Sequence, residues 1–308
     1  MNRRVGWALL AACLLALCAL AWWLWTPDKP RRELEAKYLS APGDMVPVAE
    51  WRLHVRISGS DEAPAVLLLH GFGASLHTWD SWAEGLSASH RVIRVDLPGS
   101  GLSEPDPAGN YTDARSIQML VALLDQLKVS RASVVGHSIG GRIAWSFAAL
   151  HPDRTDHLVL VAPDGFASPG FEYGQPAEVP AALGLMRHLL PKALLRMNLK
   201  PAYGNPDFLT DALTTRYHDL MLAPGARDAM LQRLQQTTLT DPVPVLARIR
   251  APTLLLWGEA DAMIPFANAK DYQQAMPGSR LVSFTGVGHL PQEEAAEASL
   301  QAVQAFLR

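Results

Sequence analysis

Short apolar runs that alternate with longer helix-like stretches constrain the fold of this chain more than any other feature. Strands buried on both faces of a sheet have this continuous apolar pattern, because neither face meets water. The five runs are AVLLLH (65–70), RVIRVD (91–96), ASVVGH (132–137), HLVLVAP (157–163) and APTLLLWG (251–258). Segment 51–58 alternates instead, which is typical of an antiparallel or edge strand. With helices expected over 112–128 and 141–150, the pattern predicts an α/β fold with a mostly parallel sheet.

The alternation stops over residues 164–245. This stretch is rich in Pro, Leu and Met, and it contains no convincing strand. We therefore expect a helical cap or lid inserted into an α/β core that comprises 46–163 and 246–308. A polar linker over 26–45 is expected to join this core to the N-terminal segment.

The N-terminal segment, residues 1–25, has the strongest compositional signal. Residues 5–25 form a run of 21 residues without a charge. A helix of that length spans roughly 31 Å at about 1.5 Å per residue, enough to cross the hydrocarbon core of a bilayer. Trp22, Trp23 and Trp25 crowd its end, where aromatic rings favour the membrane interface. We expect a single transmembrane anchor, with the rest of the chain on the non-cytoplasmic side.

Two other interpretations of this segment stay open. Ala19-Leu20-Ala21 has the small-x-small form of a signal-peptide cleavage site, after which the chain would be secreted. LAAC at 10–13 resembles a lipoprotein box. The anchor is favoured because the apolar run is longer than a typical signal core of about 7–15 residues. Basic residues flank the run on both sides, so charge does not fix the orientation, and the non-cytoplasmic expectation depends on resemblance to signal anchors.

Composition excludes several function classes. The chain has 27 basic and 30 acidic residues, a net charge of −3, so no basic excess favours nucleic acid as a partner. Both cysteines, Cys13 and Cys18, lie in the apolar run, and the rest of the chain therefore needs no disulfide. The sequence contains no HExxH and no GxxxxGK[ST] motif, so we expect no metal or phosphate site.

The stretch GHSIGG at 136–141 places a serine at a corner between an expected strand and an expected helix. This is the context that a G-x-S-x-G nucleophile motif requires. The flanking glycines let neighbouring backbone approach without a Cβ clash, and the helix N-terminus favours developing negative charge. We predict that Ser138 is a nucleophile.

A serine hydroxyl needs a base, and the base needs an acid to orient it. His289 follows a strand-like run at 281–284 and precedes the last expected helix. Asp261 lies just beyond the strand at 253–257, and it is the favoured acid; Glu259 and Asp164 remain weaker candidates. The chain order Ser138, Asp261, His289 is that of α/β-hydrolase triads.

An acyl transfer also needs donors for the oxyanion. His70-Gly71 ends an early strand, so the backbone N–H of Phe72 is expected to point into the site. Ile139, directly after the nucleophile, supplies the second N–H. We expect Phe72 and His137 to contact the substrate, and we expect Asp96 to be structural.

Six motifs together resemble the α/β-hydrolase superfamily, most closely its serine esterases, lipases and carbon–carbon bond hydrolases. They cover about 46–163 and 249–308, in the family's order. They are HGFGAS, DLPGSGLSEPD, GHSIGGRIAWSFAALHPDR, LVLVAPDGF, WGEADAMIP and GVGHLPQEE. The resemblance implies a sheet of about eight strands, a variable cap, and catalysis without a cofactor. Relatives with an aspartate nucleophile are excluded, because this chain has Ser138.

The reaction expected from these residues is hydrolysis of a small-molecule carboxylic ester through an acyl-enzyme. The leucines and methionines of 183–197 would suit a lipophilic acyl group, and the anchor makes a lipid ester a candidate; these side chains could equally serve only to pack the cap onto the core. Alternatives with the same triad are a carbon–carbon bond hydrolase of the meta-cleavage type and an acyltransferase. A binding protein on a hydrolase scaffold is the alternative from another class. The sequence indicates no oligomeric state.

Overall fold

An eight-stranded sheet organises the part of the chain that the computed structural model describes, residues 7, 11–15, 18–19, 22, 24–167, 173–176 and 178–308. The strand order is β1-β2-β4-β3-β5-β6-β7-β8. The first two strands run antiparallel to their neighbours, and all later pairs are parallel. The strands are β1 (Met45–Val48), β2 (Trp51–Ser58), β3 (Ala65–Leu69), β4 (Arg91–Val95), β5 (Ala132–His137), β6 (Thr155–Val161), β7 (Thr253–Gly258) and β8 (Arg280–Phe284).

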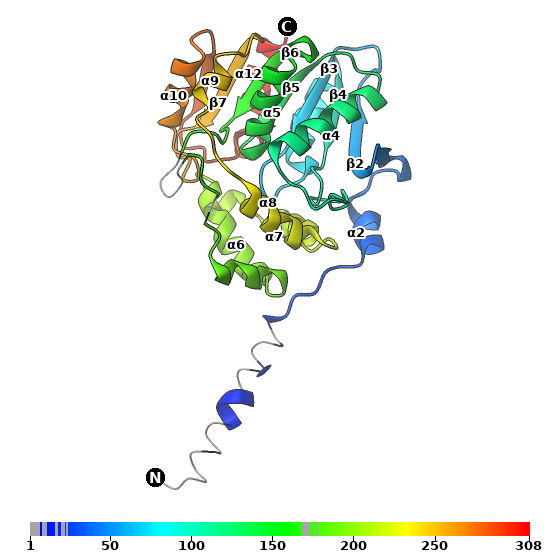
Figure 1. Ribbon diagram of the computed structural model, residues 1–308, viewed down its shortest axis with the longest axis vertical. Coiled ribbons are helices and arrows are strands. Elements are labelled where there is room, and N and C mark those ends of the chain that lie inside the picture. The colour runs from blue at the N-terminus through cyan, green and yellow to red at the C-terminus, as the bar shows by residue number, and fades with distance from the viewer. Residues whose placement is uncertain are drawn as a thin grey trace.

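Helices cover both faces of this sheet and form the cap (Figure 1). The α-helices are α2 (Arg31–Tyr38), α3 (Asp80–Leu86), α4 (Asp113–Gln126), α5 (Ile139–Leu150), α6 (Lys192–Leu199), α7 (Asp211–Met221), α8 (Ala226–Gln236), α9 (Val243–Leu246), α10 (Asn268–Ala275), α11 (Pro291–Glu294) and α12 (Ala296–Phe306). The short 3-10 helices are η1 (Pro42–Asp44), η2 (Leu76–Trp79), η3 (Pro152–Arg154), η4 (Ala181–Arg187), η5 (Lys200–Ala202) and η6 (Pro206–Phe208).

The predicted α/β fold with a mostly parallel sheet of about eight strands is confirmed. Each of the five apolar runs forms a central strand, and the alternating segment 51–58 is antiparallel β2, as expected. β3 illustrates why continuous apolar runs mark such strands. Leu67 and Leu69 pack into the core under α4 and α5, whereas Val66 and Leu68 pack against α3 and α12 on the opposite face.

The corner between β5 and α5 depends on a very close approach of backbones. A Cβ atom built on Gly140 would lie 2.5 Å from the carbonyl oxygens of both Leu69 and His70, at the end of β3. Only a residue without a side chain lets the start of α5 pack directly against that strand. Ser138 is therefore placed beside the loop that follows β3.

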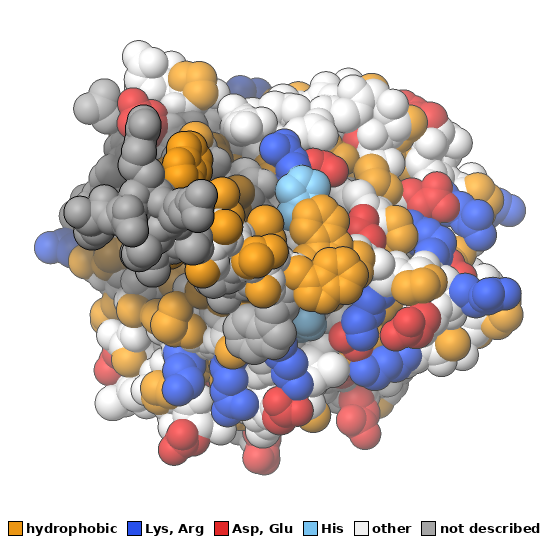
Figure 2. All heavy atoms as spheres, turned by 90° about the horizontal axis from the view of Figure 1, so that it is seen from below, with side chains coloured by type: hydrophobic (Ala, Val, Ile, Leu, Met, Phe, Trp, Pro, Cys, Tyr) orange, Lys and Arg blue, Asp and Glu red, His pale blue; other side chains and the backbone are white. Residues whose placement is uncertain are grey.

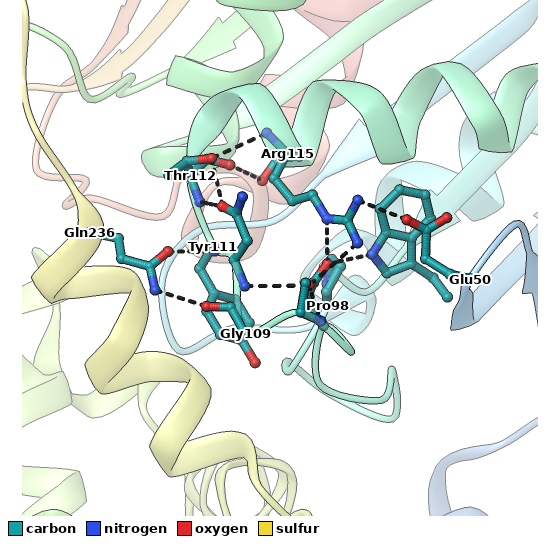
Figure 3. A network of polar contacts seen from close by, with 12 residues as sticks. Glu50, Pro98, Gly109, Tyr111, Thr112, Arg115 and Gln236 are labelled. Atoms are coloured by element: carbon teal, nitrogen blue, oxygen red, sulfur yellow. Dashed lines mark hydrogen bonds and ion pairs between the residues drawn. The ribbon is translucent and has the colours of Figure 1, made fainter.

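The cap is helical, as expected, and polar contacts tie it to the core (Figure 3). On α8, Gln236 accepts a hydrogen bond from the N–H of Tyr111 (2.7 Å) and donates one to the carbonyl oxygen of Gly109 (2.9 Å). This core loop is held in turn by Arg115 of α4, whose Nε donates to Asp106 (2.8 Å). α8 is thereby fixed over the carboxyl edge of the sheet.

Residues 26–45, expected to be a linker, are partly helical and attached to the cap. Leu34 of α2 is buried in a cluster with Leu102 and Leu220. Lys37 Nζ and the Tyr38 hydroxyl each donate to Asp219 Oδ2 at 2.7 Å. The expectation of a linker followed from the overall polarity of this stretch. Its few apolar residues, such as Leu34, attach it to the cap instead.

Much of the predicted membrane anchor at residues 5–25 lies outside the described residues, so the anchor stays a prediction. Within the described part of the chain, no helix is both long and apolar enough to cross a membrane. Figure 2 looks onto the lower face of Figure 1 and shows hydrophobic side chains gathered there. The cap's large exposed apolar side chains include Leu183, Leu185, Leu194 and Met197.

The packing at the β5–α5 corner makes a first prediction. Gly140→Ala should lower the free energy of unfolding by about 1–3 kcal/mol, because the new methyl group overpacks against backbone that cannot move aside freely. Urea unfolding followed by circular dichroism measures the change. Gly278→Ala is the matched control, since a Cβ there meets nothing within 4 Å. Equal midpoints for the two variants would contradict this account of the corner.

Candidate active site

Ser138 occupies the corner in a left-handed backbone conformation, with φ 54° and ψ −121°. Such a conformation costs of order 1–3 kcal/mol for a residue with a side chain, so the surroundings must hold it. The Ser138 N–H donates to the Val161 carbonyl (3.1 Å), and its carbonyl accepts from the N–H groups of Arg142 (3.1 Å) and Asp164 (3.0 Å). Hydrogen bonds to β6, to α5 and to the loop after β6 therefore fix the serine.

The structure brings Asp261 and His289 together from the loops that follow β7 and β8. His289 Nδ1 donates to Asp261 Oδ2 at 2.8 Å. The other carboxylate oxygen accepts from the N–H groups of Met263 (2.8 Å) and Ile264 (2.9 Å), which fixes its orientation. Because Nδ1 carries the proton, Nε2 of His289 has a free lone pair and can act as a base.

The two other candidate acids have different partners. Asp164 accepts from Arg142 Nη1 at 2.7 Å, and burial raises the pKa of its carboxyl despite that neighbour. Glu259 accepts from the hydroxyls of Ser283 (2.7 Å) and Thr285 (2.8 Å). Asp261 is thus the candidate acid that is hydrogen-bonded to His289.

His137 connects the serine corner with the His289 loop. Its Nε2 donates to the His289 carbonyl oxygen at 2.8 Å, and the two rings lie 4.6 Å apart. Burial lowers the pKa of His137 well below its usual value, so the ring is neutral. No hydrogen bond joins the Ser138 side chain to His289 among the described contacts.

His137 is only 3% exposed, and it does not line the large cavity described below. A Cβ on Gly71 would lie 2.6 Å from His137 Nδ1 and 3.2 Å from the Ser138 Cβ, so the loop after β3 covers both residues. The contact of His137 with substrate stays a prediction. The structure places this side chain against Gly71 and against the backbone of His289.

The two expected oxyanion donors have free backbone N–H groups. Neither Phe72 nor Ile139 donates a backbone hydrogen bond to any described part of the chain. His70 fixes Gly71, the residue before Phe72, because its Nδ1 donates to the Gly71 carbonyl (2.8 Å) while its Nε2 accepts from the Leu97 N–H (3.0 Å). Burial lowers the pKa of His70, which keeps the ring in this neutral form.

Asp96, expected to be structural, anchors the loops around the oxyanion donors. It accepts from His54 Nδ1 (2.7 Å), Leu76 N–H (2.6 Å) and Leu102 N–H (2.9 Å). Burial alone would raise the pKa of Asp96, but the neighbouring histidines lower it to about 2. The sequence analysis missed His54, because a histidine at a buried position of an alternating strand gives no motif signal.

A cavity of about 510 Å³ lies between the cap and the oxyanion loop. Phe72 and Gly73 form its core side, and Met263 adds a wall from the Asp261 loop. Asn198 is the single polar side chain among the described lining residues. The apolar cap residues that line it are Ala182, Leu183, Leu185, Met186, Leu189, Leu190, Pro191, Leu194, Leu195, Leu199, Met221, Met230 and Leu234.

The loop that carries His289 is also bonded to the cap. The His289 N–H donates to the Ala202 carbonyl oxygen at 2.7 Å. The Glu294 carboxylate accepts from the N–H groups of Gly288 (2.7 Å), Gly204 (3.0 Å) and Asn205 (2.6 Å). Both contacts attach residues 202–205 of the cap to the candidate base. No cluster of metal-ligating side chains occurs among the residues that the structure describes.

Comparison with known proteins places this geometry in a family. The alpha/beta hydrolase fold family matches residues 64–296. A relative from Cupriavidus pinatubonensis, named 2-hydroxy-6-oxononadienedioate/2-hydroxy-6-oxononatrienedioate hydrolase, is 28% identical over 265 residues, which are 84% of this chain and 91% of the relative.

Solved structures of other hydrolases are similar to this chain over most of its length. The enol-lactonase of Burkholderia xenovorans LB400 is 26% identical with a TM-score of 0.73, over 84% of this chain and 98% of that one. A protein described as a membrane phospholipase A and bacterial virulence factor is 25% identical with a TM-score of 0.71, over 99% of this chain and 98% of that one. With the family match extending over most of the chain, this protein belongs to the α/β hydrolase fold family.

Proposed function

We propose that this chain is a serine hydrolase that cleaves lipophilic carboxylic esters, with Ser138 as nucleophile, His289 as base and Asp261 as the orienting acid. Family membership supports hydrolysis. The observation that carries the ester proposal is the cavity of about 510 Å³ that begins at the oxyanion loop and has one polar lining side chain, Asn198. An acyl chain lying in it would bury apolar surface against the leucine and methionine side chains that line it.

The proposed reaction has two steps. Ser138 Oγ attacks the ester carbonyl and passes its proton to His289 Nε2, while Phe72 and Ile139 N–H groups bind the oxyanion. His289 then protonates the leaving alkoxide, which departs as the alcohol and leaves an acyl-enzyme. Water attacks this intermediate with His289 again as base, which releases the acid and restores the serine.

Carbon–carbon bond hydrolysis is the second candidate, and the names of the relatives support it better than the ester reading. The Cupriavidus relative is named for a dienedioate substrate, which carries two carboxylates. A buried carboxylate needs a cationic or hydrogen-bonding partner. Among the described residues that line the cavity, Asn198 is the one polar side chain and none is cationic. This lining favours an uncharged acyl chain over a dicarboxylate.

The two candidates make opposite predictions for the full chain. On p-nitrophenyl esters from acetyl to palmitoyl, kcat/KM should rise with acyl length by up to about fourfold per methylene until the cavity is full. Turnover of 2-hydroxy-6-oxononadienedioate, the dicarboxylate in the name of the Cupriavidus relative, should be negligible by comparison. Ser138→Ala should lower kcat by at least about 10³-fold, whereas Ser100→Ala, in the loop after β4, should not. Cleavage of the dienedioate without ester turnover would replace the ester proposal with the second candidate.

The position of His137 predicts a role in holding His289. His137→Phe removes the donor to the His289 carbonyl and should lower kcat by about 10–100-fold, the equivalent of a lost buried hydrogen bond, with little change in KM. His137→Gln keeps an N–H donor and should retain more of the rate. Steady-state kinetics with near-ultraviolet circular dichroism to verify folding test this. Equal losses, or a loss mainly in KM, would argue against the holding role.

We further propose that residues 5–25 anchor the chain in a membrane, with the catalytic part on the non-cytoplasmic side. The uncharged run and the exposed apolar residues of the cap support attachment to a membrane, and the resemblance to signal anchors supports the non-cytoplasmic side. The full-length chain should stay in the membrane pellet after an alkaline carbonate wash. Protease added to spheroplasts should remove the catalytic part. Release by carbonate at a reduced mass would instead indicate a cleaved signal peptide.

A further inference from the structure

Residues 24–29 are built into the cap and do not simply lead away from it. The Thr26 N–H donates to the His188 carbonyl oxygen (2.8 Å), and Thr26 Oγ1 accepts from the Leu190 N–H (3.1 Å). Trp25 stacks on the His188 ring, 4.9 Å away and inclined by 7°. The segment is therefore paired with residues 188–191, between η4 and α6, where Leu189, Leu190 and Pro191 line the cavity.

The same segment is bonded to the other side of the cap. Arg227 of α8, 4% exposed, donates through Nη1 to the Thr26 carbonyl (2.7 Å) and through Nη2 to Asp28 (2.6 Å). The Lys29 N–H donates to the Leu222 carbonyl at the end of α7 (2.8 Å). Residues 24–29 thus bridge η4 to the turn between α7 and α8.

Because residues 24–29 are attached to the cap in this way, Leu24 forms part of the cavity wall. It lines the cavity together with Met186 and Leu185 of η4. Figure 1 shows the chain that leads to α2 passing along the lower side of the cap. The cavity walls therefore include this segment as well as Phe72 and Gly73 of the oxyanion loop.

We infer that Leu24, whose segment is held by Thr26, Asp28 and Arg227, forms a wall of the acyl cavity that limits the length of the acyl chain that fits. This deepens the proposed function and rests on it for the identity of the ligand. The sequence motifs of the core do not indicate which acyl-chain length the cavity accepts. A segment outside both the core and the cap insertion determines selectivity for chain length.

The test measures binding and turnover separately on the full chain. Saturated fatty acids of 8 to 18 carbons compete with a fluorescent fatty acid for the Ser138→Ala form, so affinity is read without catalysis. Leu24→Trp should shorten the best-bound chain and weaken binding of the longest chains about tenfold, since each excluded methylene costs about fourfold in Kd. Leu24→Ala should shift the optimum toward longer chains.

Leu14→Trp is the matched control, because Leu14 lies in the same apolar run, is exposed and does not line the cavity. Its binding profile should equal that of the parent. An optimum that stays fixed in both Leu24 variants would overturn the inference, even if esters are hydrolysed. Fatty-acid binding that shifts as expected, without ester turnover by the wild-type chain, would uphold the cavity inference and reject the ester proposal.

Discussion

The backbone of Ser138 is the constraint on which the candidate site depends. A left-handed conformation at a residue with a side chain persists only where the surroundings hold it, and here β6, α5 and the loop after β6 all bond to this residue. Gly140 allows α5 to start against the end of β3. The hydroxyl, the Ile139 N–H and the loop of Phe72 consequently converge at one sheet edge.

Much of this arrangement could be predicted from the sequence, because local patterns carry it. Continuous apolar runs specify strands that are covered on both faces, and β3 shows both faces packed. The order of Ser138, Asp261 and His289 along three strand ends specifies which loops meet, since parallel strands end at one edge. Choosing Asp261 over Glu259 and Asp164 followed from its distance beyond β7, and its hydrogen bond to His289 agrees with that choice.

Contacts between distant segments could not be predicted in this way. His137 has the same local motif whether its ring faces substrate or the His289 carbonyl, and only the folded position of the His289 loop decides between them. Residues 26–45 are polar on average, yet Leu34 is buried in a cluster from the core and the cap, and Lys37 and Tyr38 bond to Asp219 of the cap. The wall formed by Leu24 depends on residues about 160 to 200 positions away in the chain.

The bond from the His289 N–H to the Ala202 carbonyl makes the cap mechanically asymmetric. Displacing the cap along residues 202–205 would pull on the backbone of the candidate base and remove two of the three N–H donors to Glu294, those of Gly204 and Asn205. Displacing it along η4 would leave that loop untouched. A substrate that displaces the cap at η4 would therefore leave His289 in place. Entry at residues 202–205 would instead move the His289 loop away from its position.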